Sequence, residues 1–177
     1  MRRLLTAPLF DERRGTSYQI VFGVWAMVAV YAVLHDQYVV RIAPEHFTVY
    51  HEPVWNLTDA GALAAAWAFK ASFIPGFLLG FAALVVGRRG TRPRVAVSRL
   101  LLGTGVVILA SELVSAGSGW WAHRTGDRIY PDRVYPEMTG PVMVTQTIQL
   151  TCYLASAGFS ALWLMGIAAW RRRSPGR

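Results

Sequence analysis

Long apolar stretches alternate along this chain with short polar segments that are rich in arginine. A helix needs about 20 predominantly apolar residues to cross the ~30 Å hydrocarbon layer of a bilayer. Four stretches meet this requirement, over residues 18–36, 60–86, 95–117 and 142–170. The pattern predicts an all-α integral membrane protein, a single membrane domain over residues 1–177 in which four transmembrane helices form an up-down bundle.

Composition and charge agree with this assignment. Only 16% of the residues are charged, against about 25% in a typical soluble domain. The net charge of +8 is concentrated before the first span, between the second and third, and after the fourth. The positive-inside rule therefore predicts a multi-pass protein of the cell (inner) membrane with both termini in the cytoplasm. This distribution indicates no nucleic-acid partner, and the lipid bilayer is the expected one.

The two connections on the predicted outer side, residues 37–59 and 118–141, are long enough to form structure of their own. The first is rich in strand-favouring residues, including Val39, Val40 and Phe47, and is interrupted by Pro44. We therefore expect a small, partly β-like first outer loop. Residues 56–59 then read as a turn that ends in the N-cap of the second helix.

The second outer connection contains a tandem repeat. Residues 128–132 read Arg-Ile-Tyr-Pro-Asp and residues 133–137 read Arg-Val-Tyr-Pro-Glu. Tyrosine and arginine are frequent interface anchors. Arg128, Tyr130, Arg133 and Tyr135 are therefore candidate docking residues, either for a membrane protein partner or for self-association. The alternative is a loop that merely lies over the bundle.

Small residues mark where the helices should approach one another. Gly76 and Gly80 are four residues apart in the second span, next to Pro75, and the third and fourth spans carry further glycine, serine and alanine. Glycine at this spacing allows close contact between two helices in a membrane. Packing within the chain explains these residues, and oligomerisation is not required.

Two charged residues lie inside the apolar spans, Lys70 in the second and Glu112 in the third. At 1.5 Å per residue their depths differ by roughly 7 Å, which a lysine side chain can bridge. Charges inside a bilayer normally pair or face a cavity, so we expect an ion pair between Lys70 and Glu112. This pair could serve as a proton or ion relay, or as a structural clamp between two helices.

A second group of polar residues is expected on the outer face, where all four histidines fall. Imidazole and carboxylate groups bind divalent metals and support acid–base chemistry. Their spacing here matches no established metal motif and identifies neither a metal nor a cofactor. The candidate residues are His35, Asp36, Arg41, Glu45, His51 and His123.

Part of this face resembles a known sequence pattern. The run from His35 to Gln37, followed by residues 41–51, is similar to a segment of an uncharacterised family of small bacterial four-helix membrane proteins. In that pattern His-Asp-Gln ends a helix and Arg-x-x-Pro-Glu-Tyr-Phe-Thr-x-x-His follows. The resemblance covers about the first half of the chain and fails at His46, where the pattern has tyrosine. No activity is established for that family, and the resemblance implies only that His35, Asp36, Arg41, Glu45 and His51 are the stronger candidates.

Two functional hypotheses follow. No established catalytic motif occurs in the sequence, and together with the tandem repeat this favours a non-enzymatic accessory or assembly component with interaction loops on its outer face. The alternative is a metal- or proton-dependent small transporter or membrane enzyme, which would use the outer polar residues above the Lys70–Glu112 pair. A site that connects these residues would favour the alternative.

Overall fold

The computed structural model describes residues 12–135 and 139–174. Its four long helices are α1 (Arg14–Ile42), α3 (Ala60–Arg88), α4 (Val97–Thr125) and α5 (Gly140–Arg173), and its two short ones are α2 (Glu45–Thr48) and the 3-10 helix η2 (Asp132–Val134). Each of the four long helices is long and apolar enough to cross a membrane. The predicted all-α, four-helix membrane bundle is thus confirmed. Pro136 and Glu137 of the tandem repeat lie outside the described residues.

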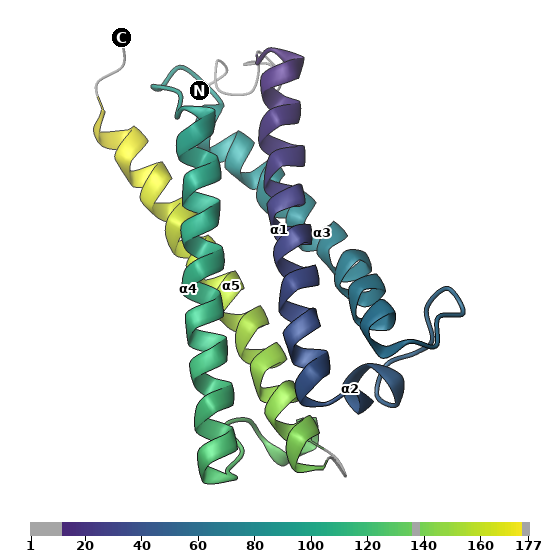
Figure 1. Cartoon of the computed structure of the whole chain (residues 1–177). Coiled ribbons are helices and arrows are strands. Elements are labelled where there is room, and N and C mark those ends of the chain that lie inside the picture. The colour runs from purple at the N-terminus through teal and green to yellow at the C-terminus, as the bar shows by residue number, and fades with distance from the viewer. Residues whose placement is uncertain (1–11, 136–138, 175–177) are drawn as a thin grey trace.

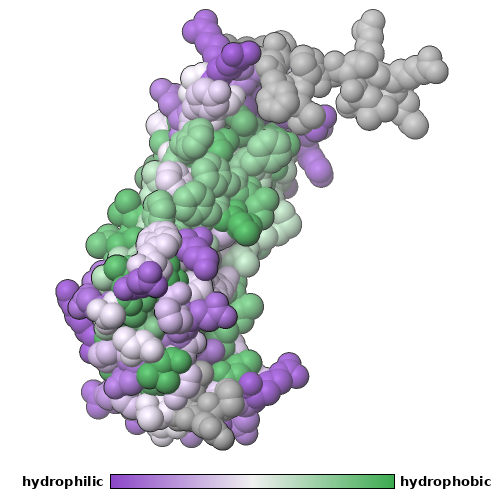
Figure 2. Space-filling model, turned by 90° about the vertical axis from the view of Figure 1, so that its right-hand side faces the viewer, coloured by the Kyte–Doolittle hydropathy of each residue, from purple (hydrophilic) through white to green (hydrophobic). Residues whose placement is uncertain are grey.

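The helices run up and down between two ends of the bundle. The start of α1, the end of α5 and the α3–α4 connection lie together at one end, and α2 lies at the other end with the α4–α5 connection (Figure 1). We call these the termini end and the loop end. On the side seen in Figure 2, a hydrophobic band lies next to the polar termini end, whereas polar and apolar residues mix toward the loop end. On this side, the hydrophobic band therefore does not continue unbroken to the loop end.

Two predicted spans stop too early at that end. α1 continues to Ile42 and α4 continues to Thr125, through segments that had been assigned to outer loops. The expected β-like structure is also wrong, because the described residues contain no strand and residues 45–48 form α2. Val39 and Val40 favour strands locally, but both are buried within the bundle, and tertiary packing overrides their propensity. The predicted N-cap is present, with Asp59 accepting a hydrogen bond of 2.8 Å from the Ala62 backbone N–H.

Glycine contacts build two tight helix pairs, α1 with α3 and α4 with α5. A Cβ atom at Gly80 would lie 2.7 Å from the carbonyl oxygen of Val21, and one at Gly76 would lie 2.9 Å from the Trp25 ring. In α4, Gly103 lies against Trp163 of α5 in the same way. Contact within each pair is far more extensive than contact between α1 and α4, α1 and α5, or α3 and α5. The small residues thus serve packing within the chain, as predicted.

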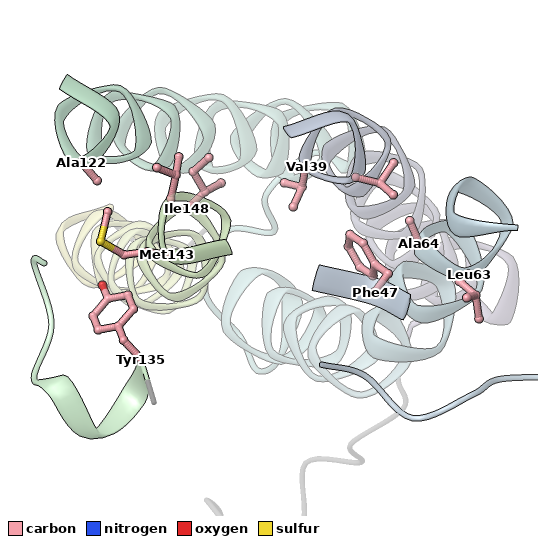
Figure 3. Packing of buried hydrophobic residues seen from close by; sticks show 10 residues of the cluster. Val39, Phe47, Leu63, Ala64, Ala122, Tyr135, Met143 and Ile148 are labelled. Carbon is pink, nitrogen blue, oxygen red and sulfur yellow. The ribbon is translucent and has the colours of Figure 1, made fainter. Parts of the chain in front are cut away.

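Apolar side chains form two separate clusters. The termini cluster consists of Ile20, Ala83, Leu84, Val95 and Leu100. The loop cluster consists of Val39, Val40, Phe47, Leu63, Ala64, Ala122, Tyr135, Met143, Val144 and Ile148. Within the loop cluster the labelled side chains gather in two groups, one around α1 and α3 and one around α4 and α5 (Figure 3). Between the two clusters, buried polar side chains such as Ser111 and Ser115 lie among apolar ones such as Val24 and Val107, so the bundle interior is partly polar.

At the termini end, one arginine joins three segments. Arg171 of α5 is only 5% exposed. Its guanidinium donates hydrogen bonds to the carbonyl oxygens of Val86 (2.6 Å), Arg89 (2.8 Å), Pro93 (2.9 Å) and Arg92 (3.1 Å). The carbonyl groups at the end of a helix have no partners within it. Arg171 therefore caps α3 and holds the end of α5 against the α3–α4 connection.

Candidate functional site

The centre of the polar interior is an imidazole–carboxylate contact between α1 and α4. His35 Nδ1 lies 2.7 Å from Glu112 Oε2, and the Tyr31 hydroxyl donates a 2.8 Å hydrogen bond to the same oxygen. The His35 side chain is 3% exposed and that of Glu112 is 28% exposed. Tyr31 and His35 are four residues apart, so they share one face of α1. An acid–base pair is thus placed within the spanning part of the bundle, with only its carboxylate partly accessible.

The second nitrogen of this imidazole is unused. His35 Nε2 is buried and has no hydrogen-bond partner within the described part of the chain. The Tyr38 ring packs edge-on against the imidazole, with a centroid separation of 5.1 Å. Imidazole and carboxylate groups are those that exchange protons most readily near neutral pH. The His35–Glu112 pair thus combines two side chains of the kinds that carry protons in proteins.

A stripe of polar residues on α5 connects this pair to the loop end. Thr145, Gln149, Cys152 and Ser156 recur at helical spacing and lie on one face of α5. The stripe makes three contacts, in which Thr145 Oγ1 is 3.0 Å from His46 Nδ1, Gln149 Nε2 donates to Asp36 Oδ1 at 2.8 Å, and Cys152 Sγ is 3.1 Å from the Tyr31 hydroxyl. We use "polar layer" for Tyr31, His35, Asp36, Glu112, Gln149 and Cys152. Its members come from both helix pairs, so the titratable groups of the polar layer lie at the interface between the pairs.

At the loop end, α2 is attached through a cluster of aromatic rings, namely His46, Phe47, His51 and Trp67, which we call the α2 cluster. His51 Nδ1 donates a 2.6 Å hydrogen bond to the His46 carbonyl, and the His51 ring lies 5.1 Å from the Trp67 ring. Burial, and to a smaller extent the neighbouring His51, lowers the pKa of His46 to about 4. His46 is therefore neutral at neutral pH and packs as an uncharged ring.

The predicted pair between Lys70 and Glu112 is not formed. Glu112 contacts His35 instead, and Lys70 lies on an exposed face of α3 with its Nζ 4.5 Å from the centre of the Trp67 ring. The prediction paired the wrong helices, because α3, which carries Lys70, packs mainly on α1 and to a smaller extent on α5. Glu112 does have a partner inside the bundle, but that partner is His35 of α1.

The six candidate residues of the outer face do not form one site. His35 and Asp36 belong to the polar layer, His51 belongs to the α2 cluster, and the other three are exposed. These three are Arg41, Glu45 and His123. Across residues 12–135 and 139–174, no group of three His, Cys, Asp or Glu side chains is placed to hold a metal ion. The predicted metal site is therefore not assembled by this part of the chain.

The tandem repeat lies over the bundle, with its tyrosines directed toward α5. The Tyr130 hydroxyl is 2.8 Å from Thr151 Oγ1, and the fully buried Tyr135 is 2.9 Å from Thr147 Oγ1. Arg128 bonds Asp132 at 2.9 Å and lies over the Tyr135 ring. Of the four predicted docking residues, only the two arginines are exposed. The structure thus agrees with the alternative interpretation of this loop.

Tyr31, Gln149, Cys152 and Thr145 were missed by the sequence analysis, although a signal for three of them was present. Polar residues at positions 145, 149 and 152 of an otherwise apolar span mark one helix face. Such a face needs polar partners on a neighbouring helix. For Tyr31 no signal was available, since a single tyrosine in a transmembrane helix has no diagnostic spacing.

Comparison with known proteins adds no relative to this picture. No family model, no curated protein and no solved structure matches the chain. The functional assignment therefore rests on the geometry of the polar layer.

Proposed function

We propose that this chain is a proton-dependent membrane protein of the small-transporter type, with the His35–Glu112 pair as its proton acceptor. The observation that carries this proposal is the 2.7 Å contact between a buried imidazole and a carboxylate, located between two helix pairs. Glu112 lies about 20 Å along α4 from Arg99, at 1.5 Å per residue, which is within the hydrocarbon layer. Ionisable groups at such depth are costly, and they are usually retained for a function.

The two helix pairs supply the moving parts. Each pair is held together by glycine contacts that permit little adjustment. The two pairs meet through apolar side chains in the termini cluster, and toward the loop end also through hydrogen bonds of the polar layer. Protonation of Glu112 removes the charge that strengthens its bonds to His35 and Tyr31. The α1–α4 interface is then weaker, and one pair can shift against the other as a rigid unit. Loss of the proton restores the original packing.

The exposure of the two side chains indicates which of them exchanges the proton with solvent. Only Glu112 is partly exposed, so the proton exchanges at this carboxylate, and the buried His35 responds through the shared hydrogen bond. In the orientation we propose, the termini end faces the cytoplasm of a cell with an inner membrane. Glu112 then lies in the outer half of the bilayer and is loaded from outside.

Distance measurements across the two pairs test this function. Spin labels at Leu78→Cys on α3 and Leu162→Cys on α5, both exposed positions, report the separation of the pairs by pulsed electron paramagnetic resonance. We expect the distance distribution of the otherwise native protein to change with pH in a single step. Glu112→Gln should show the low-pH distribution at every pH, and Lys70→Gln, outside the polar layer, should behave as the native protein. Identical distributions from pH 4.5 to 8 would mean that the pair is only a structural clamp.

A second function, an accessory or assembly component, is supported by a different feature. Ile129 is 44% exposed, and Arg133 is exposed on the same α4–α5 connection. Protein–protein interfaces have an apolar core and are enriched in arginine. Purification in a gentle detergent followed by mass spectrometry tests this assignment. A stoichiometric protein that is lost from Ile129→Ser and Arg133→Ser would support it, and a chain that purifies alone would not.

A further inference from the structure

We propose that Lys70, Trp67 and the segment 49–59 form a binding site for the phosphate group of a phospholipid in the leaflet at the loop end. We call this segment the Trp55 loop. The proposal concerns residues outside the polar layer and is independent of proton binding.

Lys70 has no acidic partner within the described part of the protein. It lies on an exposed face of a membrane-spanning helix, and no carboxylate in the described part of the chain is within ion-pair distance of its Nζ. Its Nζ lies 4.5 Å from the centre of the Trp67 ring, which leaves the outward side of the ammonium open. A cation at a lipid-facing position needs an anion or water beside it. The partner must therefore come from the surroundings of the protein.

The depth of this position matches the lipid headgroups. Trp67 lies about 31 Å along α3 from Arg88, and Trp120 lies about 31 Å along α4 from Arg99, at 1.5 Å per residue. Both distances equal the ~30 Å thickness of the hydrocarbon layer. Tryptophan concentrates at this boundary, and Arg124 lies over the Trp120 ring as Lys70 lies over Trp67. Lys70 is one turn deeper and bends toward the boundary, as lysine side chains commonly do.

The Trp55 loop adds an apolar surface beside Lys70. Trp67 Nε1 donates a 2.9 Å hydrogen bond to the Glu52 carbonyl, which holds the loop alongside α3 rather than beyond its end. Figure 1 shows the α2–α3 connection projecting sideways from the bundle. The Trp55 side chain is 67% exposed, and Val49 and Tyr50 are exposed as well. The loop thus lies at the level of the headgroups and presents its largest apolar side chain outward.

Backbone strain indicates that this exposure is maintained for a reason. Trp55 has φ = 50° and Asn56 has φ = 55°. Asparagine tolerates this left-handed region, but a bulky residue such as tryptophan rarely adopts it. Strained positions of this kind cluster at ligand-binding segments. An indole held outward next to a cation suits a lipid, because the ring contacts the glycerol and upper acyl region while the ammonium contacts the phosphate.

Native mass spectrometry in detergent can test the site with three probes. These are dioctanoyl phosphatidylglycerol, dioctanoylglycerol, which lacks the phosphate, and inorganic phosphate. We expect the native protein and Lys70→Arg to bind the phospholipid, and Lys70→Met to lose about tenfold in affinity, the equivalent of one charge-assisted hydrogen bond. Arg133→Met removes an exposed cation from the same end outside the proposed site, and it should bind as the native protein does.

Three results would overturn the proposal. Equal binding by Lys70→Met would exclude the cation, equal binding of dioctanoylglycerol would exclude phosphate recognition, and tight binding of inorganic phosphate alone would indicate a free-anion site. Because Lys70 is exposed, Lys70→Met should keep the native melting temperature, and Lys70→Gln provides a second variant should Lys70→Met fail to fold.

Tryptophan fluorescence tests the position of the Trp55 loop. Quenching of this fluorescence by phosphatidylcholine brominated near the headgroup should be stronger in the native protein than in Trp55→Phe. Equal quenching of the two would show that the loop lies outside the bilayer.

Discussion

The two halves of the bundle are held together by different kinds of contact. In the termini half, apolar residues fill the interior, and Arg171 donates to four backbone carbonyl groups. In the loop half, α1 meets α4 and α5 through contacts that each include a carboxylate, His35 with Glu112 and Asp36 with Gln149. A guanidinium stays charged at any physiological pH, and a carbonyl does not titrate. The termini half holds one carboxylate in such a contact, Glu12, and its hydrogen bond to Arg88 lowers its pKa, so that it stays ionised near neutral pH. Near neutral pH we therefore expect the loop half to be the part that responds to protons.

This contrast shows how one small bundle can be both rigid and responsive. The termini half fixes the spacing of α3, α4 and α5 at one end, so a change at the other end becomes a pivot rather than a dissociation. Packed interfaces tend to have discrete arrangements, and protons bound in the polar layer can select between them. A substitution in one half should therefore change the property that belongs to that half, stability at every pH in the termini half and sensitivity to pH in the loop half.

The largest effect is expected from Arg171→Met. This substitution leaves four carbonyl groups of the α3 end and the α3–α4 connection without their donor, in a site that is 95% buried when the native arginine is in place. Because the bonds involve a charged donor, we expect a loss of about 3–5 kcal/mol in the free energy of unfolding. The loss should be the same at pH 5 and pH 8, as measured by denaturation in detergent. Arg172→Met, an exposed neighbour, should cost little, and a pH-dependent loss in Arg171→Met would break the proposed division between the halves.

The next effect concerns pH and His46. Its pKa is lowered to about 4 in the folded protein from an ordinary value of 6.5, so between these values the unfolded chain binds a proton that the folded chain does not. Stability is therefore complete above pH 6.5 and falls as the pH drops toward 4, by up to about 3 kcal/mol. His46 contacts Thr145, Phe47 and His51, and Glu45 precedes it in the chain.

His46→Gln isolates this contribution. The variant keeps a hydrogen-bonding side chain opposite Thr145 and removes only the imidazole, whereas all other groups still titrate as before. The difference in stability between the native protein and His46→Gln should thus narrow as the pH falls from 7 to 4. If both proteins lose the same stability over this range, burial of the His46 ring is not what makes the loop end sensitive to acid.

A smaller effect is expected within the polar layer itself. In a double-mutant cycle, His35→Gln and Glu112→Gln should each destabilise the protein, and the double variant should cost less than the sum, with a coupling of about 1–2 kcal/mol. The coupling should disappear at a pH where Glu112 is protonated in the native protein. Denaturation of the four proteins in one detergent measures it. Additive losses would show that the two side chains, although 2.7 Å apart, contribute independently.

Features of the fold that depend on the local sequence could be predicted, whereas features that depend on packing between distant segments could not. The four spans were predicted because apolar runs of that length can only be helices in a bilayer. The helical continuation through Val39 and Val40 was not, because it depends on their burial in the loop cluster. Glu112 was correctly expected to need a partner, but its identity follows from which helices pack together. Gly76 and Gly80 place α3 against α1, whereas Gly23 lies against Leu101 where α1 meets α4. Depth alone carries no information about these contacts.

The smallest effect separates two roles of the tandem repeat. Tyr135→Phe removes a 2.9 Å bond to Thr147 in a fully buried site, and we expect it to cost about 1 kcal/mol. Tyr130→Phe removes the 2.8 Å bond to Thr151 at a half-buried site and should cost less, about 0.5 kcal/mol. If the loop covers the bundle, Tyr135→Phe should lose more stability than Tyr130→Phe, because the loss depends on how deeply each hydroxyl is buried. A docking loop would show the opposite signature, with unchanged stability in both variants and a weaker hold on a co-purifying protein. Thermal denaturation and purification of the same two variants therefore show whether the tandem repeat covers the bundle or docks another protein.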